Sequence, residues 1–536
     1  MLSYASGVDE PPLLDETIGE NLARTVARVG DREALVECET GRRWTYAEFS
    51  EATVRIATAL LHRGIQPGDR VGIWSPNTAE WAMIQYATAQ IGAILVTINP
   101  AYRAEELEYV LNQSSVALVL SAESFKTSDY AGMLAAVAGR CPHLRDVVII
   151  GSPSWSAIAG TEADAGALRD VQAGLRPSDA INIQYTSGTT GFPKGATLTH
   201  ANILNNGYLV GECLEYTEAA RVCIPVPFYH CFGMVLGNLA CTSHGAAMVI
   251  PSAGFDPEST LKAVAAQRCT SLYGVPTMFI AELSLPNFAE YDLSSLQTGI
   301  MSGSPCPEHV MRNVIDRMHM VGVAICYGMT ETSPVSTQTL PTDSLHRRVG
   351  TVGRVGPHLE IQIVDGAGAQ VPRGVPGELC TRGYSVMAGY WGDPDKTAEA
   401  IDTDGWMHSG DVAVMDDDGY LSVTGRIKDM VIRGGENIYP REVEEFLHSH
   451  PDIIDAQVVG VRDEKYGEEL MAWIRVTDGA QPPTTEDLRA FCAGRIAHQK
   501  IPRYVEVIDE FPLTVTGKVR KVELRTRGEE LLGGGS

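Results

Sequence analysis

Strand-like and helix-like segments alternate through roughly the first 200 residues of the chain, and this order limits the fold more than any other feature. Residues 70–74, 93–98 and 116–120 are short apolar runs typical of buried strands. Between them, amphipathic segments begin with capping-box spacing at Thr45–Glu48 and again at Asn77–Glu80. Strand–helix–strand order of this kind predicts parallel sheets joined by crossover helices.

The pattern changes after about residue 405. Residues 412–415 and 420–423 flank an Asp-rich turn and predict a β-hairpin. Residues 456–461 and 470–476 predict strands of a small α+β unit, which places a domain boundary near residues 426–429. A chain of 536 residues is too long for one compact core, so a large and a small domain are expected.

Composition excludes several classes of protein. The formal net charge of -25 argues against a nucleic-acid partner and against attraction to an anionic membrane surface. The eleven cysteines have irregular spacing and no Cys-x-x-Cys pair, which argues against a disulfide framework or a zinc site. No apolar stretch of about 18 residues is long enough for stable membrane insertion, and no signal peptide is recognisable. We therefore expect a cytoplasmic protein with reduced cysteines.

The most informative segment is Tyr185–Gly195, which follows the strand-like residues 181–184. Its glycines allow tight turns, its hydroxyl groups donate hydrogen bonds, and its lysine adds positive charge, as a polyphosphate-binding loop requires. It lacks the spacing of a Walker A loop, and a solvated linker is the alternative interpretation. The candidate phosphate contacts are Thr186, Ser187, Gly188, Thr189, Thr190, Gly191 and Lys194.

This loop resembles the signature of the adenylate-forming superfamily, which contains acyl-CoA synthetases, peptide-synthetase adenylation domains and firefly-type luciferases. Further motifs follow in the family's order, and the match extends from about Thr45 to Lys521. The likeness is greatest to the medium-chain fatty acyl-CoA synthetases. It implies an α/β fold with a large N-terminal domain (1–427) of two α/β subdomains and a β-rich subdomain. A small mobile α+β C-terminal domain (428–529) and a flexible tail (530–536) would follow.

The resemblance also implies an ATP site. Tyr327 of the segment Tyr327–Glu331 would stack on adenine, with Gly328 and Met329 beside it, and Thr330 would contact the α-phosphate. Glu331 would bind Mg²⁺, which prefers one or two carboxylates and completes its shell with phosphate and water. The remaining nucleotide contacts implied are Gly303 and Ser304 at the adenine, and Asp411 and Arg426 at the ribose.

Two C-terminal segments resemble parts of the family that act in different half-reactions, one in forming the acyl-adenylate and the other in transferring the acyl group to coenzyme A. Lys518 matches a catalytic lysine that neutralises charge on the transferred adenylyl group. Lys428 and Asp429 fall at the family's interdomain hinge. Gly435 falls where the small domain lines a tunnel for the pantetheine arm of coenzyme A, although a plain turn glycine would look the same.

The acid-binding end carries a weaker pattern. His230 matches a substrate-side histidine, with a core histidine as the alternative. An apolar acid pocket without a counter-ion is suggested by Phe228, Phe232, Met234, Met329 and Val335.

Together, these features predict an enzyme, an AMP-forming acid–thiol ligase. It would convert a medium-chain fatty or similar apolar acid and ATP to an acyl-adenylate and then transfer the acyl group to coenzyme A. A carrier protein or another acceptor, a different oxyanion, a luciferase-like oxygenase and a non-catalytic nucleotide- or acyl-binding module are the alternatives. The oligomeric state is left open, with a homodimer as one alternative.

Overall fold

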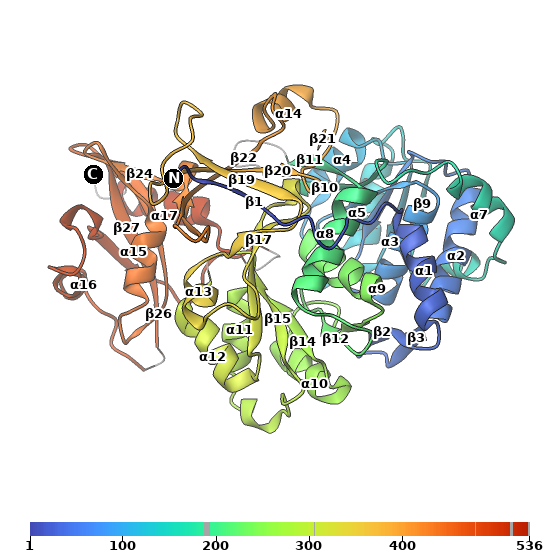
Figure 1. The fold of residues 1–536 in the computed structure, drawn as a ribbon, viewed down its shortest axis with the longest axis horizontal. Coiled ribbons are helices and arrows are strands. Elements are labelled where there is room, and N and C mark those ends of the chain that lie inside the picture. The colour runs from blue at the N-terminus through green and yellow to red at the C-terminus, as the bar shows by residue number, and fades with distance from the viewer. Residues whose placement is uncertain (187–192, 305, 478, 515–517, 534–536) are drawn as a thin grey trace.

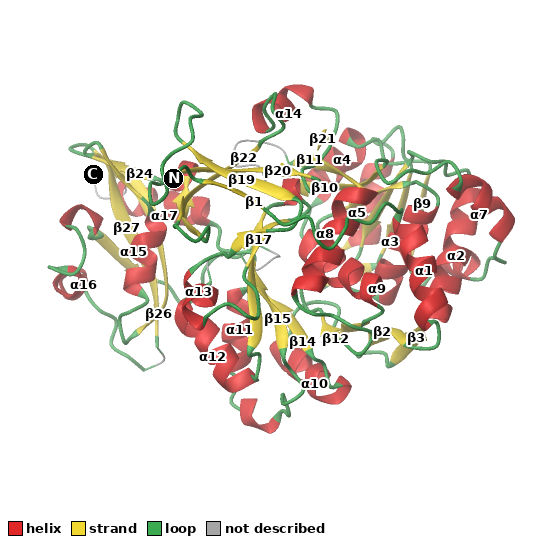
Figure 2. Ribbon diagram, viewed as in Figure 1, coloured by secondary structure: helices red, strands yellow, loops and turns green. Residues whose placement is uncertain are grey.

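The computed structural model describes residues 1–186, 193–304, 306–477, 479–514 and 518–533. Figures 1 and 2 show two units of helices and strands that lie beside each other, with a further sheet across their upper side. The C-terminal part of the chain forms a smaller unit at the opposite end from the first helices. This architecture confirms the predicted α/β class, with two α/β subdomains, a β-rich subdomain and a small α+β domain.

The first α/β subdomain is built on a sheet with the strand order β21-β11-β10-β5-β4-β6-β9. The strands from β10 to β9 pair in parallel, as the alternation predicts, whereas β11 and β21 are antiparallel. The strands are β4 (Arg70–Trp74), β5 (Ile94–Thr97), β6 (Leu118–Ser121), β9 (Asp146–Ile149), β10 (Ala180–Thr186), β11 (Lys194–Thr199) and β21 (Gly389–Tyr390). The helices of this part are α1 (Ile18–Val29), α2 (Tyr46–His62), α3 (Ala79–Gln90), α4 (Ala104–Gln113), α5 (Tyr130–Ala138), α6 (Pro153–Ala159) and α7 (Ala165–Gln172).

The capping prediction is right for α2 and wrong for α3. Thr45 and Glu48 form the expected capping box at the start of α2. Helix α3 is instead capped by Thr78, whose hydroxyl accepts the Trp81 N–H. Asn77 has tertiary partners: its amide donates to Val226 O (2.9 Å), and its Oδ1 accepts from Phe228 N (2.8 Å). Those partners come from a distant segment, so local spacing could not reveal them.

The second α/β subdomain has the strand order β18-β17-β16-β15-β14-β12-β13-β2-β3, with parallel pairing from β16 to β2. The strands are β2 (Glu33–Glu37), β3 (Arg42–Thr45), β12 (Arg221–Cys223), β13 (Ala247–Ile250), β14 (Ser271–Gly274), β15 (Thr298–Ser302), β16 (Gly322–Gly328), β17 (Val335–Gln338) and β18 (Arg354–Val355). The helices are α8 (His200–Cys213), the π-helix η1 (Phe232–Leu239), α9 (Ala240–His244), α10 (Pro257–Gln267), α11 (Pro276–Leu283), α12 (Glu308–Met318) and α13 (Leu345–Gly350).

The β-rich subdomain joins both ends of the large domain. Its sheet has the order β1-β19-β20-β22-β23, and all neighbours are antiparallel. Strands β22 and β23 form the predicted hairpin. The chain's first residues add β1 beside β19, a long-range pairing without a local sequence signal. The elements are β1 (Tyr4–Ser6), β19 (Leu359–Val364), β20 (Gly377–Gly383), β22 (Met407–Met415), β23 (Leu421–Arg426) and α14 (Pro394–Ala400).

The short 3₁₀ turn η4 (Ile427–Asp429) leads from β23 into the small domain. That domain has a sheet of order β25-β24-β27-β26, with β28 on β27. Its strands are β24 (Val431–Arg433), β25 (Glu436–Ile438), β26 (Ile453–Asp463), β27 (Gly467–Val476) and β28 (Tyr504–Val507), and its helices are α15 (Pro440–Leu447), α16 (Thr485–Cys492) and α17 (Lys521–Gly533).

All eleven cysteines carry free thiols. In the described ranges, no helix combines the length and apolar character that a membrane crossing requires.

Candidate active site

The phosphate loop leaves the first sheet at the end of β10 and returns at the start of β11. Thr186 and Lys194 face each other across this antiparallel pair. The ammonium of Lys194 lies 4.8 Å from the ring centroid of Tyr390, a cation–π contact. Lys194 is thereby held at the start of β11, against Tyr390 of β21. The other predicted loop contacts, Ser187, Gly188, Thr189, Thr190 and Gly191, lie outside the described residues.

Asp411 lies in a polar cluster to which the strands β16, β22 and β23 each contribute one side chain. Tyr327 Oη donates to Asp411 Oδ2 (2.7 Å), and Arg426 Nε donates to Asp411 Oδ1 (3.0 Å). The pKa of Tyr327 is raised well above its usual value by burial and by the nearby Asp411, so the phenol keeps the proton that it donates. The cluster fixes a nearly buried carboxylate between two residues that were predicted to bind the same nucleotide.

Thr330 and Glu331 are both buried and lie on the short 3₁₀ turn η3 (Thr330–Thr332), directly after β16. Tyr390 Oη donates a 2.8 Å hydrogen bond to Glu331 Oε1. A side chain at Gly328 would place its Cβ 1.8 Å from Pro334 O, so the close approach of the backbone to that carbonyl requires glycine. The chain from Gly328 through Met329 to Glu331 is therefore held tightly.

Lys518 reaches this cluster from the C-terminal domain. Its Cε lies 3.7 Å from the position that a Cβ on Gly303 would occupy, and Gly303 itself has a φ of +91°. Burial and, to a smaller extent, Arg426 lower the pKa of Lys518, whereas Asp411, Cys231 and Glu331 raise it, and the net pKa is about 8. Lys518 thus lies among residues of the nucleotide cluster and beside the loop that contains Gly303 and Ser304.

His230 is buried near Lys518. Burial and the neighbouring Lys518 lower the pKa of His230 to about 3, so its imidazole is neutral at physiological pH. Its Nδ1 accepts the Phe232 N–H (3.1 Å), which leaves the ring proton on Nε2. His230 can therefore donate a hydrogen bond but brings no charge to the site.

Two residues of this site were missed by sequence reasoning. Tyr390 connects Lys194 and Glu331, and only the adjacent Gly389 and Trp391 mark its segment as unusual. Gln184 accepts from both the N–H (3.1 Å) and the thiol (2.8 Å) of Cys231, and its Nε2 lies 2.8 Å from Met234 Sδ. Gln184 belongs to the strand that enters the phosphate loop, which is the one signal that could have identified it.

The predicted acid-pocket residues lie in one large apolar core, which buries Phe228, Phe232, Met234 and Val335 and against which Met329 packs. Phe228 is fully buried, with its ring edge-on to Trp81 at 5.6 Å, and Phe232 stacks on Tyr273 at 5.7 Å. Met234 is the residue that contacts Gln184. The assignment of Phe228, Phe232, Met234, Met329 and Val335 to an acid pocket stays a prediction.

Gly435 is not brought to the Lys518 cluster. It lies at the exposed tip of the β24–β25 hairpin, where Gly434 and Gly435 have φ values of +60° and +89°. A Cβ on Gly435 would have no described atom within 4 Å. The positive φ values therefore favour glycine at this turn. A role of Gly435 in the pantetheine tunnel stays a prediction.

Comparison with known proteins agrees with this geometry. Residues 22–391 match the AMP-binding enzyme family, and residues 442–518 match the C-terminal domain of AMP-binding enzymes. The chain is 49% identical over 542 residues to the provisionally named acyl-CoA synthetase YngI of Bacillus subtilis (strain 168), covering 97% of this chain and 98% of that protein. It is 44% identical over 554 residues to the mitochondrial medium-chain acyl-CoA ligase ACSF2 of Danio rerio, covering 99% and 91%.

Solved structures share the whole fold. The anthranilate CoA ligase AuaEII in complex with anthranoyl-AMP is 25% identical, with a TM-score of 0.87 and coverage of 97% of this chain and 98% of that chain. MatB from Rhodopseudomonas palustris, 27% identical, gives a TM-score of 0.83 in its ATP-bound form and 0.73 in its apo form, each with 97% of this chain and 100% of that chain covered.

Fold and site together define an adenylate-forming enzyme. The chain belongs to the AMP-binding enzyme family, within its acyl-CoA synthetases. It is thus an AMP-forming acyl-CoA ligase, as the sequence motifs predicted.

Proposed function

We propose that this enzyme uses ATP to activate a monocarboxylic acid with an uncharged tail of medium chain length. It then transfers the acyl group to coenzyme A. The observation that carries the proposal is the position of Lys518. A lysine from the small domain is desolvated beside Gly303 and among Asp411, Arg426 and Glu331 of the large domain. A cation held at this junction suits a reaction that develops negative charge on a transferred adenylyl group.

In the first half-reaction, a carboxylate oxygen attacks the α-phosphorus of ATP, and pyrophosphate leaves. Asp411 would accept hydrogen bonds from the ribose hydroxyls, because a carboxylate can accept from both at once. Its own orientation is fixed by Tyr327 and Arg426. Thr186, Lys194 and the loop between them would bind the β- and γ-phosphates, and Thr330 would contact the α-phosphate.

Glu331 fits the requirements of a magnesium ligand. It is a buried carboxylate with one oxygen oriented by the Tyr390 phenol, and it lies on the turn that also carries Thr330. Mg²⁺ bound there would neutralise phosphate charge and keep water and phosphate in its remaining positions. The residues of this chain would hold the Glu331 carboxylate in place before ATP arrives.

The second half-reaction requires Lys518 to leave the active site and the pantetheine arm of coenzyme A to enter it. We propose that the small domain rotates about Lys428 and Asp429, next to the η4 turn, and that the β24–β25 hairpin with Gly435 then borders the thiol's path. The sulfur attacks the acyl carbonyl, the thiol proton is released, and AMP leaves. The TM-scores of the two MatB forms support a state of this chain closer to the ATP-bound arrangement, since the same protein fits less well in its apo form.

The proposed chemistry of the acid is supported by the neutral His230 and by the thioether of Met234 in the same region. Neither provides a counter-ion for a second charge on the acid. The medium chain length is proposed from the likeness to ACSF2, a medium-chain acyl-CoA ligase.

A pyrophosphate-release screen across fatty acids of graded length, aromatic acids, dicarboxylic acids and amino acids tests the proposal. We expect the greatest kcat/KM for a medium-chain fatty acid, with thioester formed when coenzyme A is present. Preference for a dicarboxylic or amino acid would contradict the proposed acid, and a product formed on an amine or carrier protein but not on coenzyme A would contradict the acceptor.

A further inference from the structure

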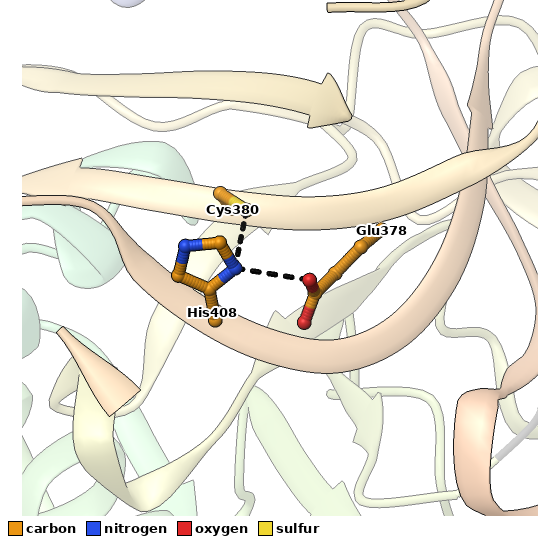
Figure 3. Close-up of side chains that lie close together, drawn as sticks. All are labelled: Glu378, Cys380 and His408. Atoms are coloured by element: carbon orange, nitrogen blue, oxygen red, sulfur yellow. Dashed lines mark hydrogen bonds and ion pairs between the residues drawn. The ribbon is translucent and has the colours of Figure 1, made fainter. Parts of the chain in front are cut away.

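A cluster of unlike metal-binding side chains lies in the β-rich subdomain, outside the nucleotide site. Glu378 and Cys380 lie on β20, and His408 lies on the neighbouring strand β22, directly opposite Cys380 in the sheet register. Figure 3 shows the three side chains pointing toward one another from these strands. His408 Nδ1 lies 3.5 Å from Cys380 Sγ and 2.9 Å from Glu378 Oε2.

The groups around the cluster orient its members. The second oxygen of Glu378, Oε1, accepts the N–H of Gly410 (3.0 Å), which fixes the carboxylate. Asp402 Oδ2 lies 3.7 Å from His408 Nε2, on the far side of the ring from Cys380 and Glu378. In the metal-free chain the 2.9 Å contact to Glu378 favours the ring proton on Nδ1, and a metal ion at Nδ1 would shift that proton to Nε2, which faces Asp402. Val364 and Trp406 form an apolar backing behind the Cys380 thiol.

We propose that Glu378, Cys380 and His408 bind a divalent, thiol-preferring metal ion, with zinc as the best match. A tetrahedral zinc with ordinary bond lengths sets its sulfur and nitrogen ligands about 3.5 Å apart and its nitrogen and oxygen ligands about 3.4 Å apart. The first spacing is already present, and the second needs the carboxylate to move by about half an ångström.

Charge and access fit the same ion. A thiolate and a carboxylate together cancel the charge of a divalent cation, so the loaded site would be neutral. Glu378 and His408 keep 21% and 30% of their side-chain surface exposed, whereas Cys380 is buried. The open side lies at the carboxylate and imidazole, where a water molecule can complete the coordination.

The simpler interpretation is a hydrogen bond between His408 and Glu378 beside an inert thiol. The release of protons on metal binding distinguishes a metal site from this interpretation. Cys380 is a free, buried thiol in the metal-free chain. Zinc binds cysteine as the thiolate, so binding displaces the thiol proton. We therefore expect proton release on binding and an affinity that rises with pH.

Cobalt(II) and zinc titrations of the full chain test the proposal, after chelator treatment and reduction and without nucleotide. Cobalt should give the near-ultraviolet charge-transfer band of a thiolate ligand at one equivalent. Cys380→Ser should abolish the band, and His408→Gln should weaken zinc binding at least tenfold, as judged against a competing chromophoric chelator. Asp402→Asn should weaken it about tenfold through the ring orientation. Cys141→Ser removes a buried thiol from the first subdomain and should change nothing.

The proposal is overturned if the wild-type chain shows no such band, or if the band persists in Cys380→Ser. Should Cys380→Ser fail to fold, as judged by circular dichroism, Glu378→Gln and His408→Gln carry the test. Glu378→Gln keeps an oxygen acceptor for Gly410, and unchanged zinc affinity in both variants would equally refute the site.

Discussion

Tyr390 donates a 2.8 Å hydrogen bond to Glu331, and its ring also contacts the ammonium of Lys194 at 4.8 Å. One edge-strand residue of the first sheet is thereby connected to a turn of the second α/β subdomain and to the end of the phosphate loop. The subdomains are joined at the point where ATP phosphates and a metal ion are proposed to bind.

Tyr390→Phe should raise the Mg²⁺ concentration needed for half-maximal pyrophosphate release by about tenfold, since a hydrogen bond to a charged group contributes about 1.5–3 kcal/mol. The ring and its contact to Lys194 would remain. Tyr4→Phe is the matched control, because Tyr4 donates a similar bond (2.6 Å) to Glu360 on the surface. If Tyr390→Phe and Tyr4→Phe show the same Mg²⁺ dependence, Tyr390 has only a structural role.

Lys518→Ala should lower pyrophosphate release about 100-fold or more, the usual cost of removing a donor to transition-state charge. Thioester formation from supplied acyl-adenylate should stay within a few-fold of wild type, because Lys518 belongs to the adenylating arrangement. Acetylation of Lys518 should act in the same way by removing its charge. Lys262→Ala, which removes an exposed helix lysine, serves as control. Equal loss of both half-reactions would contradict a two-conformation mechanism.

The pH profile of adenylation should have an alkaline limb near pH 8. Burial lowers the pKa of Lys518 to about 8, so raising the pH through this value removes the proton, and with it the charge that adenylation needs. The limb should appear in kcat/KM for ATP, which reports the nucleotide-free enzyme. In Lys518→Arg it should disappear, because a guanidinium stays charged. A wild-type profile that is flat through this region would show that Lys518 does not carry the limb.

Asp411→Asn should raise the KM for ATP at least tenfold and depress adenylation, since Tyr327 and Arg426 would lose their shared anion. Asp343→Asn provides a close control. Asp343 also accepts from a tyrosine (Tyr420, 2.6 Å) and faces an arginine (Arg354, 3.9 Å), away from the nucleotide cluster. If both variants lose only thermal stability and keep the same KM, Asp411 is a structural residue of β22 and not a ribose ligand.

Gly435→Leu should leave single-turnover adenylation working and stop thioester formation, because a side chain would enter the proposed path of the pantetheine arm. The structure adds a cost in folding, since a non-glycine residue at a φ of +89° is strained by about 1–2 kcal/mol. Gly368→Leu matches this cost, as Gly368 is exposed, has a φ of +81° and has open space around it. If the Gly435→Leu and Gly368→Leu variants have similar melting curves and Gly435→Leu still makes thioester normally, Gly435 does not line the pantetheine tunnel.

Local patterns predicted elements well where the determining partners are near in sequence. The capping box at Thr45, the parallel strands of the first sheet and the β22–β23 hairpin all depend on neighbours or on simple periodicity. Asn77 was assigned wrongly because its side chain bonds to residues about 150 positions away, which left the cap to Thr78. The pairing of β1 with β19 escaped prediction for the same reason.

The sequence by itself determined the chemical groups of the enzyme and the order of the motifs that carry them. The glycines, hydroxyls and lysine after residue 184, the carboxylates Glu331 and Asp411, and Lys518 can be read without coordinates. Tertiary structure decided which of these groups meet. Only the fold brings Tyr390 to Glu331 and holds Asp411 between Tyr327 and Arg426. Desolvation and opposing charges then set the pKa of Lys518, and those energies depend on distances in space between residues that are far apart in the chain.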